Sequence, residues 1–333
     1  MNNPKHIILS RTDSIGDVIL TMPIAGFLKE KYPHCKISFL GKSYTEAVVK
    51  LSSFIDKFLN WEEIQEMVHG DQVNYIAQLE ADWIIHIFPN KKIAHLAKEA
   101  GIENRVGTSH RLHHFTTCNH RPNFTRKNSD LHESQLNFIL LKPLIGDYMP
   151  DKDAIFNWYG FTKVMEKNWI KHLMDEHRYN LILHPKSQGS AREWGLDNFT
   201  KLINILPEDR YNIYVTGTKE EAAEMKDFLE EHHERINDVT GQFTLDELIA
   251  FINYADGLVA ASTGPLHIAA ALGKRVVGLY APMRPIHPGR WEPIGPNARA
   301  LVIDKDCSDC KKDLQCECIR SIKPGHVLAA LEV

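Results

Sequence analysis

Short apolar segments alternate with amphipathic ones along the first half of the chain. Four segments are short and rich in aliphatic and aromatic residues, which is typical of buried strands in a parallel sheet. They cover residues 7–9, 36–40, 83–88 and 105–107. Apolar residues recur at helical spacing over residues 18–31, 44–51, 93–100 and 131–141. This alternation predicts a mostly parallel sheet covered by helices.

The same alternation begins again in the second half of the chain. Strands are predicted at residues 181–183, 212–215, 257–261 and 275–280, and helices at 164–177, 199–206, 220–232, 245–253 and 266–272. Residues 143–157 are rich in loop-forming residues and are the candidate linker. We therefore predict an α/β protein with two Rossmann-like, doubly wound domains, residues 1–155 and 156–333, that face a central cleft. A length of 333 residues agrees with two domains.

The predicted strand at residues 257–261 leads into a turn of small polar residues, Ser262, Thr263 and Gly264. Pro265 suits the first turn of a helix, where its missing N–H costs nothing. A helix that begins on small residues after a buried strand offers backbone N–H groups and the positive end of its dipole. The pattern fits an ordinary strand–helix unit with a good cap, and it also fits a phosphate site.

The first predicted strand ends in a polar segment that contains Asp17. The segment reads Ser-Arg-Thr-Asp-Ser-Ile-Gly-Asp over residues 10–17, just before a predicted helix. Ligands of open α/β sheets bind beyond the carboxyl ends of strands. Asp17 could cap the helix, or it could act as a general base that takes a proton from a substrate hydroxyl. The segment contains neither G-x-G-x-x-G nor a P-loop motif, so neither a dinucleotide site nor a P-loop site is supported.

Charge and hydropathy argue against two classes of partner. The formal net charge of −4 is not that of a dedicated nucleic-acid-binding protein. No apolar run approaches the length of a membrane span, and the N-terminal residues lack the features of a signal peptide. We expect a cytoplasmic protein with at most peripheral contact, at the inner face of the cytoplasmic membrane.

Four of the six cysteines cluster near the C-terminus, at Cys307, Cys310, Cys316 and Cys318. In a reducing compartment such a cluster is more naturally a metal site or a set of thiols than a set of disulfides. A structural zinc site is one interpretation. The Cys-x-Cys pair is a less usual spacing for zinc.

Residues 105–127 contain arginine and histidine but no acid. The segment could bind an anionic acceptor, with Arg105 and Arg111 as candidate contacts, or it could be an ordinary solvated loop.

Two blocks of the sequence resemble glycosyltransferase family 9, the heptosyltransferase-like enzymes. The first is R-T-D-S-I-G-D-V-I-L-T-M-P-I at residues 11–24, and the second runs over residues 245–282. Residues 184–199 resemble the strand and loop on the phosphate side of that family's donor site. The resemblance spans most of the chain and implies the GT-B fold, with two Rossmann-like domains and an active site between them.

The resemblance also implies roles for individual residues. In the N-terminal domain, expected to take the acceptor, Asp17 matches the catalytic base, and Ser14, Gly16 and His132 match positions near the acceptor or the transferred sugar. In the C-terminal domain, expected to take the donor, the matching positions are Lys186, Ser187, Arg192, Thr216, Gly217, Ser262, Thr263, Gly264, Pro265 and His267.

One position departs from the family pattern. Members of the family usually carry an acid where this chain has Ser262, and often Asn where it has Ala261. That acid is associated with the hydroxyls of the donor sugar. The departure argues against ADP-heptose as the donor but leaves glycosyl transfer in place.

Together these features predict an inverting, metal-independent glycosyltransferase. Asp17 would activate the acceptor hydroxyl, while Arg192 and the helix that begins near Pro265 would stabilise the departing diphosphate. The expected donor is a nucleoside-diphosphate sugar, and the expected acceptor is a cell-envelope saccharide or lipid-linked saccharide of lipopolysaccharide type. The scheme requires no cofactor. Two alternatives stay open: a nucleotide-sugar-binding homologue without transfer activity, and a sugar-nucleotide epimerase on the same fold.

Overall fold

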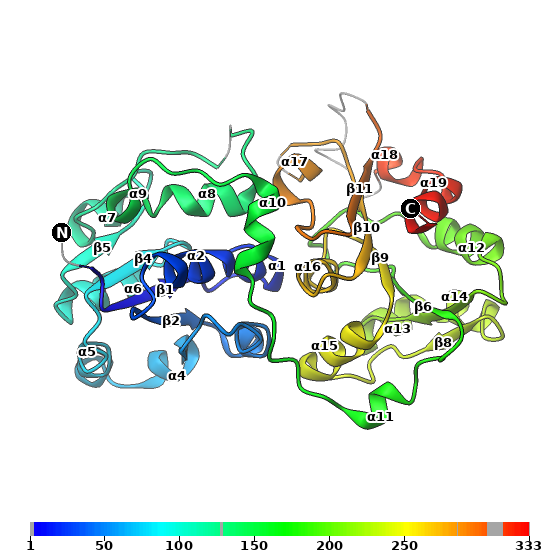
Figure 1. The fold of residues 1–333 in the computed structure, drawn as a ribbon, viewed down its shortest axis with the longest axis horizontal. Coiled ribbons are helices and arrows are strands. Elements are labelled where there is room, and N and C mark those ends of the chain that lie inside the picture. The colour runs from blue at the N-terminus through cyan, green and yellow to red at the C-terminus, as the bar shows by residue number, and fades with distance from the viewer. Residues whose placement is uncertain (1–2, 127–128, 285, 305–315, 333) are drawn as a thin grey trace. The chain divides into compact units, whose positions relative to one another are not determined.

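The chain forms two compact units, Met1–Lys163 and Val164–Val333, called unit 1 and unit 2 below (Figure 1). The computed structural model describes residues 3–126, 129–284, 286–304 and 316–332. No helix among these residues is long and apolar enough to span a bilayer.

The division falls after Lys163 rather than at the predicted boundary at residue 155. The intervening residues are attached to unit 1 by backbone contacts. Ser52 and Phe161 form an antiparallel bridge, and the Ser53 N–H donates to the Gly160 carbonyl at 2.8 Å.

Unit 1 contains a five-stranded parallel sheet with the spatial order β3-β2-β1-β4-β5. The strands are β1 (His6–Ser10), β2 (Lys36–Gly41), β3 (Lys57–Asn60), β4 (Trp83–His86) and β5 (Asn104–Val106). The α-helices are α1 (Ile15–Ile19), α2 (Pro23–Lys31), α3 (Glu46–Val49), α4 (Trp61–Glu66), α5 (His69–Ala77), α6 (Lys91–Glu99), α7 (Leu112–Thr117), α8 (Glu133–Ile139), α9 (Lys142–Ile145) and α10 (Lys152–Ile155). Two 3₁₀ turns are η1 (Ser43–Thr45) and η2 (Phe156–Trp158).

The predicted helix over residues 18–31 is wrong as a single element, because α1 ends at Ile19 and α2 begins at Pro23. Proline has no N–H for the fourth carbonyl before it and its ring crowds that turn. The break matters because it leaves α1 as a short separate helix that carries Asp17.

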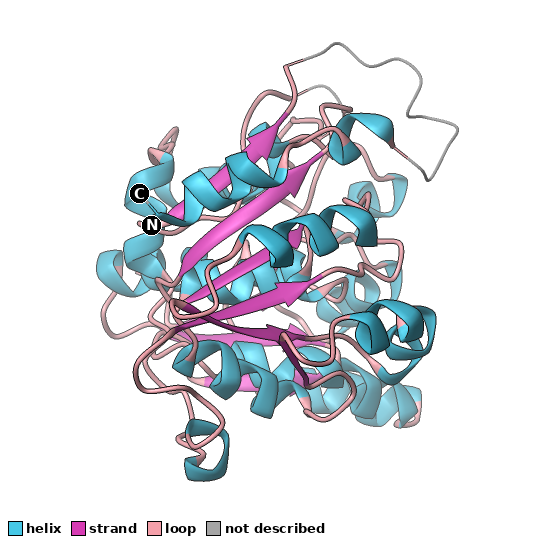
Figure 2. Ribbon diagram, turned by 90° about the vertical axis from the view of Figure 1, so that its right-hand side faces the viewer, coloured by secondary structure: helices cyan, strands magenta, loops and turns pink. Residues whose placement is uncertain are grey.

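Unit 2 contains a six-stranded parallel sheet with the order β11-β10-β9-β6-β7-β8, and Figure 2 shows its strands running side by side between helices. The strands are β6 (Tyr179–His184), β7 (Tyr211–Val215), β8 (Ile236–Asp238), β9 (Gly257–Ala261), β10 (Arg275–Tyr280) and β11 (Ala298–Val302). The helices are α11 (Asn168–Lys171), α12 (Leu196–Ile205), α13 (Lys219–Glu224), α14 (Lys226–Glu231), α15 (Leu245–Tyr254), α16 (Gly264–Ala271), α17 (Pro288–Trp291), α18 (Glu317–Arg320) and α19 (Pro324–Glu332).

The predicted helix over residues 164–177 is confirmed only as the short α11. The Asp175 carboxylate accepts the backbone N–H groups of His177 and Arg178, both at 2.9 Å. An aspartate that bonds the backbone two and three residues on forms a turn in place of a continuing helix.

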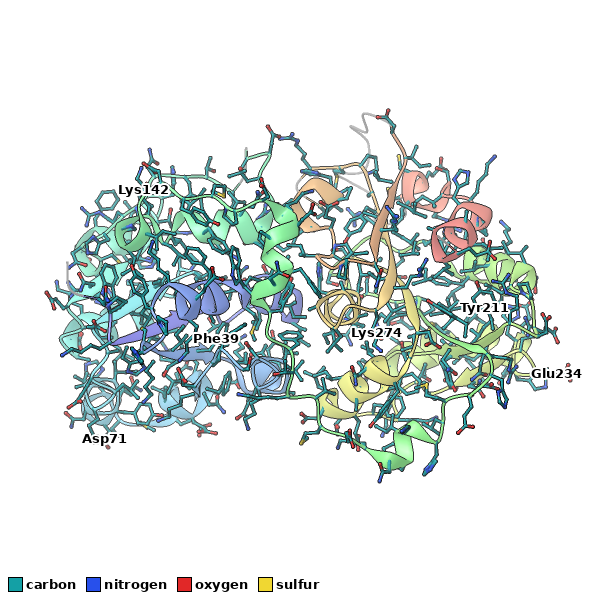
Figure 3. The ribbon with its side chains drawn as sticks, in the orientation of Figure 1. Phe39, Asp71, Lys142, Tyr211, Glu234 and Lys274 are labelled. Atoms are coloured by element: carbon teal, nitrogen blue, oxygen red, sulfur yellow. The ribbon has the colours of Figure 1, made fainter. Side chains whose placement is uncertain are left out.

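Each sheet is held by an apolar core of aliphatic and aromatic side chains. In Figure 3, Phe39 lies among the side chains inside unit 1, whereas Asp71 and Glu234 project outward from their units. In both sheets the chain first winds to one side and then returns to the other. The switch points lie between β1 and β4 in unit 1 and between β6 and β9 in unit 2. Ligands of doubly wound sheets bind beyond the carboxyl ends of strands at such points.

Candidate active site

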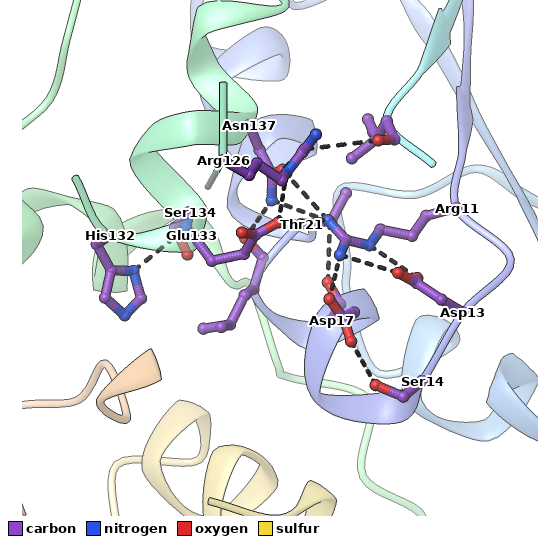
Figure 4. Close-up of polar contacts among 12 residues, drawn as sticks. Arg11, Asp13, Ser14, Asp17, Thr21, Arg126, His132, Glu133, Ser134 and Asn137 are labelled. Carbon is purple, nitrogen blue, oxygen red and sulfur yellow. Dashed lines mark hydrogen bonds and ion pairs between the residues drawn. The ribbon is translucent and has the colours of Figure 1, made fainter. Parts of the chain in front are cut away.

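Arg11 lies directly after β1 and is the centre of a buried polar cluster in unit 1 (Figure 4). Its Nε and Nη2 donate to the two oxygens of Asp13 at 2.8 and 3.0 Å, and Nη2 also donates to Asp17 Oδ1. Burial disfavours the charge of Arg11, but the charges of Asp17, Asp13 and Glu133 outweigh that cost and raise the pKa of Arg11 above its ordinary value. The guanidinium therefore stays charged and fixes the segment that leads into α1.

Two residues of α8, more than a hundred positions after Arg11 in the sequence, complete the cluster. Arg11 Nη1 donates to Glu133 Oε1 at 3.1 Å and to Asn137 Oδ1 at 3.2 Å. Arg126 donates to the same two oxygens, at 3.0 and 2.9 Å. Glu133 and Asn137 are fully buried. The two guanidinium groups thus compensate a carboxylate that would otherwise be a costly buried charge.

Asp17 presents its carboxylate at the more open side of this cluster. Its side chain is 19% exposed, compared with 4% for Arg11. One oxygen, Oδ1, accepts from Arg11, and the other, Oδ2, accepts from the Ser14 hydroxyl (Figure 4). Because Arg11 holds one oxygen, the direction of the other is set. An acceptor hydroxyl that joins or replaces Ser14 there would meet a carboxylate placed to take its proton.

Gly16 and His132 also lie on elements of the cluster. Gly16 is inside α1, where its carbonyl accepts the Leu20 N–H at 3.0 Å. His132 is the N-cap of α8, and its Nδ1 accepts the Ser134 N–H at 3.2 Å. His132 therefore positions the start of the helix that carries Glu133.

Arg105 and Arg111 lie apart from the cluster within the described part of the chain. The Arg105 guanidinium donates to the carbonyls of Ile102, Glu103 and Thr117, at 2.7 Å for Thr117. It therefore connects the segment before β5 with the one after it. Arg111 is exposed at the start of α7.

The loop after β6 carries Lys186 and Ser187. Lys186 Nζ pairs with Glu193 Oε2 at 3.1 Å and with Glu224 Oε2 at 2.8 Å. Burial works against the charge of Lys186, but the hydrogen bonds to these two glutamates raise its pKa above the ordinary value. The Ser187 N–H donates to Glu193 Oε1 at 3.1 Å. Glu193 thus orders the loop, and the half-buried Arg192 lies next to it.

Thr216 and Gly217 follow β7, the neighbour of β6. The Thr216 hydroxyl lies 3.0 Å from His184 Nδ1, and burial lowers the pKa of His184 to about 4. A Cβ on Gly217 would lie 3.2 Å from Glu221 Oε2. Glycine therefore allows the chain to pass close to the start of α13.

The turn after β9 carries Thr263 at the N-cap of α16, as predicted. Its backbone is extended, Pro265 occupies the first turn, and its side chain makes no capping hydrogen bond. Thr263 Oγ1 is buried and finds no hydrogen-bond partner in the described part of the chain. His267, one turn into α16, is also buried. A buried hydroxyl with no partner, placed beside the N–H groups of a helix start, is the arrangement that an anionic oxygen would satisfy.

Ser262 points to a different partner. Its side chain acts on the Tyr280 hydroxyl and lowers the pKa of Tyr280, but burial outweighs this effect and raises that pKa above the ordinary value. The Tyr280 hydroxyl in turn donates to the Trp291 carbonyl at 2.7 Å. Ser262 therefore connects the turn to the interior of unit 2.

A pocket of about 490 Å³ opens in unit 2 between the loop after β6 and helix α13. It is lined by Lys186, Gln188, Gly189, Glu193, Glu220, Glu221 and Glu224. Carboxylates accept hydrogen bonds from hydroxyl and amino groups and repel phosphates, so this pocket suits a neutral polar group.

The predicted zinc site is only half described. Cys307 and Cys310 lie outside the described residues, while Cys316 and Cys318 are buried in the core of unit 2. The zinc assignment stays a prediction.

Low pH should destabilise unit 1 because two of its histidines are buried. Burial, with the nearby charges of His114 and His113, lowers the pKa of His86 to about 3, and burial lowers that of His114 to about 4. In the unfolded chain both titrate near pH 6.5, so the unfolded state binds more protons between these values. The free energy of unfolding should fall as the pH drops below about 6.5, by about 1.4 kcal/mol per pH unit for each histidine. Urea unfolding at several pH values measures this slope.

The His86→Phe variant tests the assignment. Neither ring nitrogen of His86 has a hydrogen-bond partner among the residues described, so phenylalanine removes the titration without removing a hydrogen bond. We expect a shallower slope in this variant than in the unchanged protein. An equal slope for His86→Phe and the unchanged protein would contradict the assignment.

Sequence reasoning did not identify Arg11, Asp13, Glu133 and Asn137 as parts of the site. The local signal for the first two was an arginine at a strand end with acids two and six positions later. Glu133 and Asn137 carry no comparable local signal, because their partners are distant in sequence.

Comparison with known proteins identifies the class of protein. The profile of glycosyltransferase family 9 (heptosyltransferase) matches residues 76–319, so the chain belongs to this family. A Haemophilus influenzae protein described as a glycosyltransferase is 26% identical over 301 residues, covering 87% of this chain and 86% of that protein. Lipopolysaccharide heptosyltransferase 3 of Escherichia coli is 22% identical and covers 80% of each chain.

Solved structures agree on the fold. The structure of E. coli ADP-heptose lipopolysaccharide heptosyltransferase II has a TM-score of 0.77 at 17% identity and covers 98% of this chain and 97% of that one. A family 9 glycosyltransferase from Veillonella parvula has a TM-score of 0.75 at 19% identity and covers 98% of this chain and 96% of that one. The predicted fold class, α/β of GT-B type with two Rossmann-like domains, is confirmed. The protein is a glycosyltransferase, and this classification disfavours the binding-only and epimerase alternatives.

Proposed function

We propose that this protein transfers a sugar from a nucleoside-diphosphate sugar to a lipopolysaccharide-type saccharide, with inversion at the anomeric carbon and without a catalytic metal. The observation that carries the proposal is the turn from Ser262 to Pro265. It lies at the switch point of the unit 2 sheet, at the start of a buried helix, with an unsatisfied buried hydroxyl on Thr263 in the part of the chain that is described.

In this proposal unit 2 binds the donor. The N-terminus of α16 and Arg192 hold the diphosphate, and their positive potential stabilises it as it departs. The carboxylate-lined pocket takes the nucleoside, because carboxylates accept hydrogen bonds from ribose hydroxyls and base amino groups. This divides the donor into an anionic part and a neutral part, each with matching chemistry.

Asp17 of unit 1 serves as the general base. It removes the proton of the acceptor hydroxyl as that oxygen forms a bond to the anomeric carbon and the bond to the diphosphate breaks. A single displacement of this kind inverts the anomeric centre. Arg11 positions the Asp17 carboxylate and does not itself contact the reacting atoms.

The relatives' names guide the choice of substrates. Several relatives are named as lipopolysaccharide or lipooligosaccharide heptosyltransferases, which supports an acceptor of that type here. The donor sugar is less constrained, because Ser262, beside buried Tyr280, stands where the family usually places an acid. We also propose a peripheral location at the inner face of the cytoplasmic membrane, where such acceptors would be met.

The assay is release of nucleoside diphosphate from a panel of nucleotide sugars, with and without a truncated lipopolysaccharide acceptor. We expect acceptor-dependent release with one donor, a product of opposite anomeric configuration by NMR, and the same rate in excess EDTA. The absence of acceptor-dependent release across the panel would refute transfer. Loss of the rate in EDTA would refute metal independence alone.

Replacing Thr263 with valine should weaken binding of the donor diphosphate without reducing stability. Valine keeps the shape of the side chain, and the hydroxyl that it removes has no partner within the described residues of the ligand-free chain. A lost hydrogen bond to an anionic oxygen is expected to cost about 1.5–3 kcal/mol of binding free energy, roughly 10- to 150-fold in affinity. Calorimetric titration with the nucleoside diphosphate and thermal unfolding measure the two quantities.

Thr244→Val is the matched control. Thr244 also caps a helix of unit 2, but its side chain accepts the Glu247 N–H, so its loss should lower stability by about 0.5–2 kcal/mol and leave binding unchanged. If both variants bind the nucleoside diphosphate like the unchanged protein, Thr263 does not contact the diphosphate.

A further inference from the structure

Helix α7 exposes two large apolar side chains on the surface of unit 1. Leu112 is 89% exposed and Phe115 is 57% exposed, while His114 and Thr117 of the same helix are buried. The buried pair anchors the helix against the unit, so the exposed pair is held outward rather than free to fold inward. Two such neighbouring side chains leave apolar surface in water that binding to an apolar phase would remove.

Basic side chains surround this apolar pair. Arg121 lies over the Phe115 ring, with its guanidinium carbon 5.2 Å from the ring centroid. Lys98 of α6 reaches α7 and donates to the Thr116 carbonyl at 2.8 Å. Arg111 is exposed next to Leu112.

The first turn of α6 adds a further charge. Lys91 is exposed at the start of α6, the helix that packs against α7. Its charge, with those of His95 and Arg111, adds to burial in lowering the pKa of His113. We call Lys91, Lys98, Arg111, Leu112, Phe115 and Arg121 the α7 patch.

Acids are scarce at the α7 patch. The sequence contains no Asp or Glu between Glu103 and Asp130. The single acid of α6, Glu99, is paired with His69 at 2.7 Å. This local excess of positive charge contrasts with the net charge of −4 for the whole chain. The patch is therefore a local feature and not a reflection of a basic protein.

We propose that the α7 patch docks unit 1 on an anionic lipid bilayer, with Leu112 and Phe115 inserted among the lipid headgroups. The charge pattern favours an anionic bilayer as the binding partner. Basic side chains around an apolar centre match the negative surface and the apolar interior of such a leaflet. A second copy of the chain bound face to face would oppose basic side chains to basic side chains, which disfavours self-association through this patch. The inference does not depend on the reaction proposed above.

Co-sedimentation of the full chain with lipid vesicles tests the proposal directly. The probes are vesicles of phosphatidylcholine with about one third phosphatidylglycerol, and vesicles of phosphatidylcholine alone. We expect strong preference for the anionic vesicles, and weaker binding at high salt because screening shortens the reach of the charges. Each basic residue near an anionic leaflet raises the partition coefficient roughly fivefold. The double variant Lys91→Gln, Arg111→Gln should therefore lower partitioning about 25-fold.

The double variant Leu112→Glu, Phe115→Glu should lower partitioning by at least about tenfold, because both apolar contacts are lost and two like charges are added to the interface. Val68→Glu is the matched control. Val68 is another apolar residue of unit 1 that is 69% exposed and is not part of the α7 patch, and its replacement should leave binding unchanged. Thermal unfolding checks that all variants are folded.

Three outcomes of the vesicle assay would overturn the proposal. They are no binding to anionic vesicles, equal binding to neutral and anionic vesicles, and an equal loss in Val68→Glu and in the α7 double variant. Self-association that disappears in the α7 double variant, seen by sedimentation velocity, would assign the patch to a protein interface instead. None of these results bears on nucleotide-sugar turnover, so the docking proposal and the proposed reaction fail separately.

Discussion

Asp17→Asn should lower turnover by about 10²–10⁴-fold while the chain still folds and binds donor. Asparagine keeps the size of the side chain but cannot take a proton from the acceptor. Its amide oxygen can still accept from Arg11, the partner of Asp17 Oδ1. Its amide nitrogen would then face Ser14, whose hydroxyl oxygen can accept in place of donating. The change therefore removes the base and preserves most of the local geometry.

Steady-state kinetics with the donor that the panel assay selects, and calorimetry with its nucleoside diphosphate, measure the two effects separately. Asp71→Asn is the control, because Asp71 also lies in the first turn of a unit 1 helix but is exposed and outside the Arg11 cluster. The Asp71→Asn variant should have normal turnover. An Asp17→Asn variant with near-normal turnover would remove Asp17 from the mechanism, whatever the donor proves to be.

Arg11→Met should cause the largest loss of stability, about 3–5 kcal/mol. Arg11 is 3% exposed and donates to Asp13, Asp17, Glu133 and Asn137. Without Arg11, Glu133 still accepts from the Arg126 guanidinium, whereas Asp13 and Asp17 lose their bonds to the Arg11 guanidinium. Burial already raises the pKa of Asp13, and the Arg11 charge acts against that rise. Removing Arg11 removes this opposing effect, so the cost of burying the Asp13 charge rises.

Arg178→Met provides a matched comparison in unit 2. Arg178 also makes a two-bonded pair with an aspartate, at 2.9 and 2.7 Å to Asp175 Oδ2, but its side chain is 38% exposed. An exposed ion pair contributes about 0–1 kcal/mol to the free energy of unfolding, so this variant should lose little stability. Urea unfolding of each variant, with separate spectroscopic probes for the two units, gives the comparison. Equal costs for the two arginines would show that burial does not govern the Arg11 cluster.

Arg11→Lys separates charge from geometry. Lysine keeps the positive charge but cannot donate in the fork that Arg11 makes to Asp13, so an intermediate loss of stability is expected. Turnover should also fall, because the Asp17 carboxylate loses the partner that sets its direction. If Arg11→Lys keeps full turnover, Arg11 is not a positioning residue for Asp17.

Much of the fold could be predicted because its signals are local. The strand over residues 257–261, the turn at Thr263 and the helix that follows Pro265 all lie where their patterns placed them. Capping and proline preferences act within a few residues and so can be read from the order of residues alone. The same holds for α15, whose Thr244 and Glu247 form the capping box at its start.

Predictions failed where a single local feature overrode a longer pattern. The apolar spacing over residues 18–31 is helical throughout, yet Pro23 separates α1 from α2. The amphipathic stretch after residue 164 gives only α11 before the Asp175 turn. In the segment after β5, where periodicity is lost, six residues still form α7 because His114 and Thr117 are buried against the unit.

The sequence by itself determined the two βα series, the parallel sheets, the helix start at Thr263 and the position of Asp17 before a helix. Hydrophobic periodicity and capping depend on neighbours in the chain, and these were sufficient. Only the tertiary structure decided that Arg11 meets Glu133 and Asn137, that Thr263 keeps an unsatisfied hydroxyl among the described residues, and that Ser262 turns to Tyr280. Burial and the pairing of charges depend on residues brought together from distant parts of the chain, and no local pattern records which residues those are.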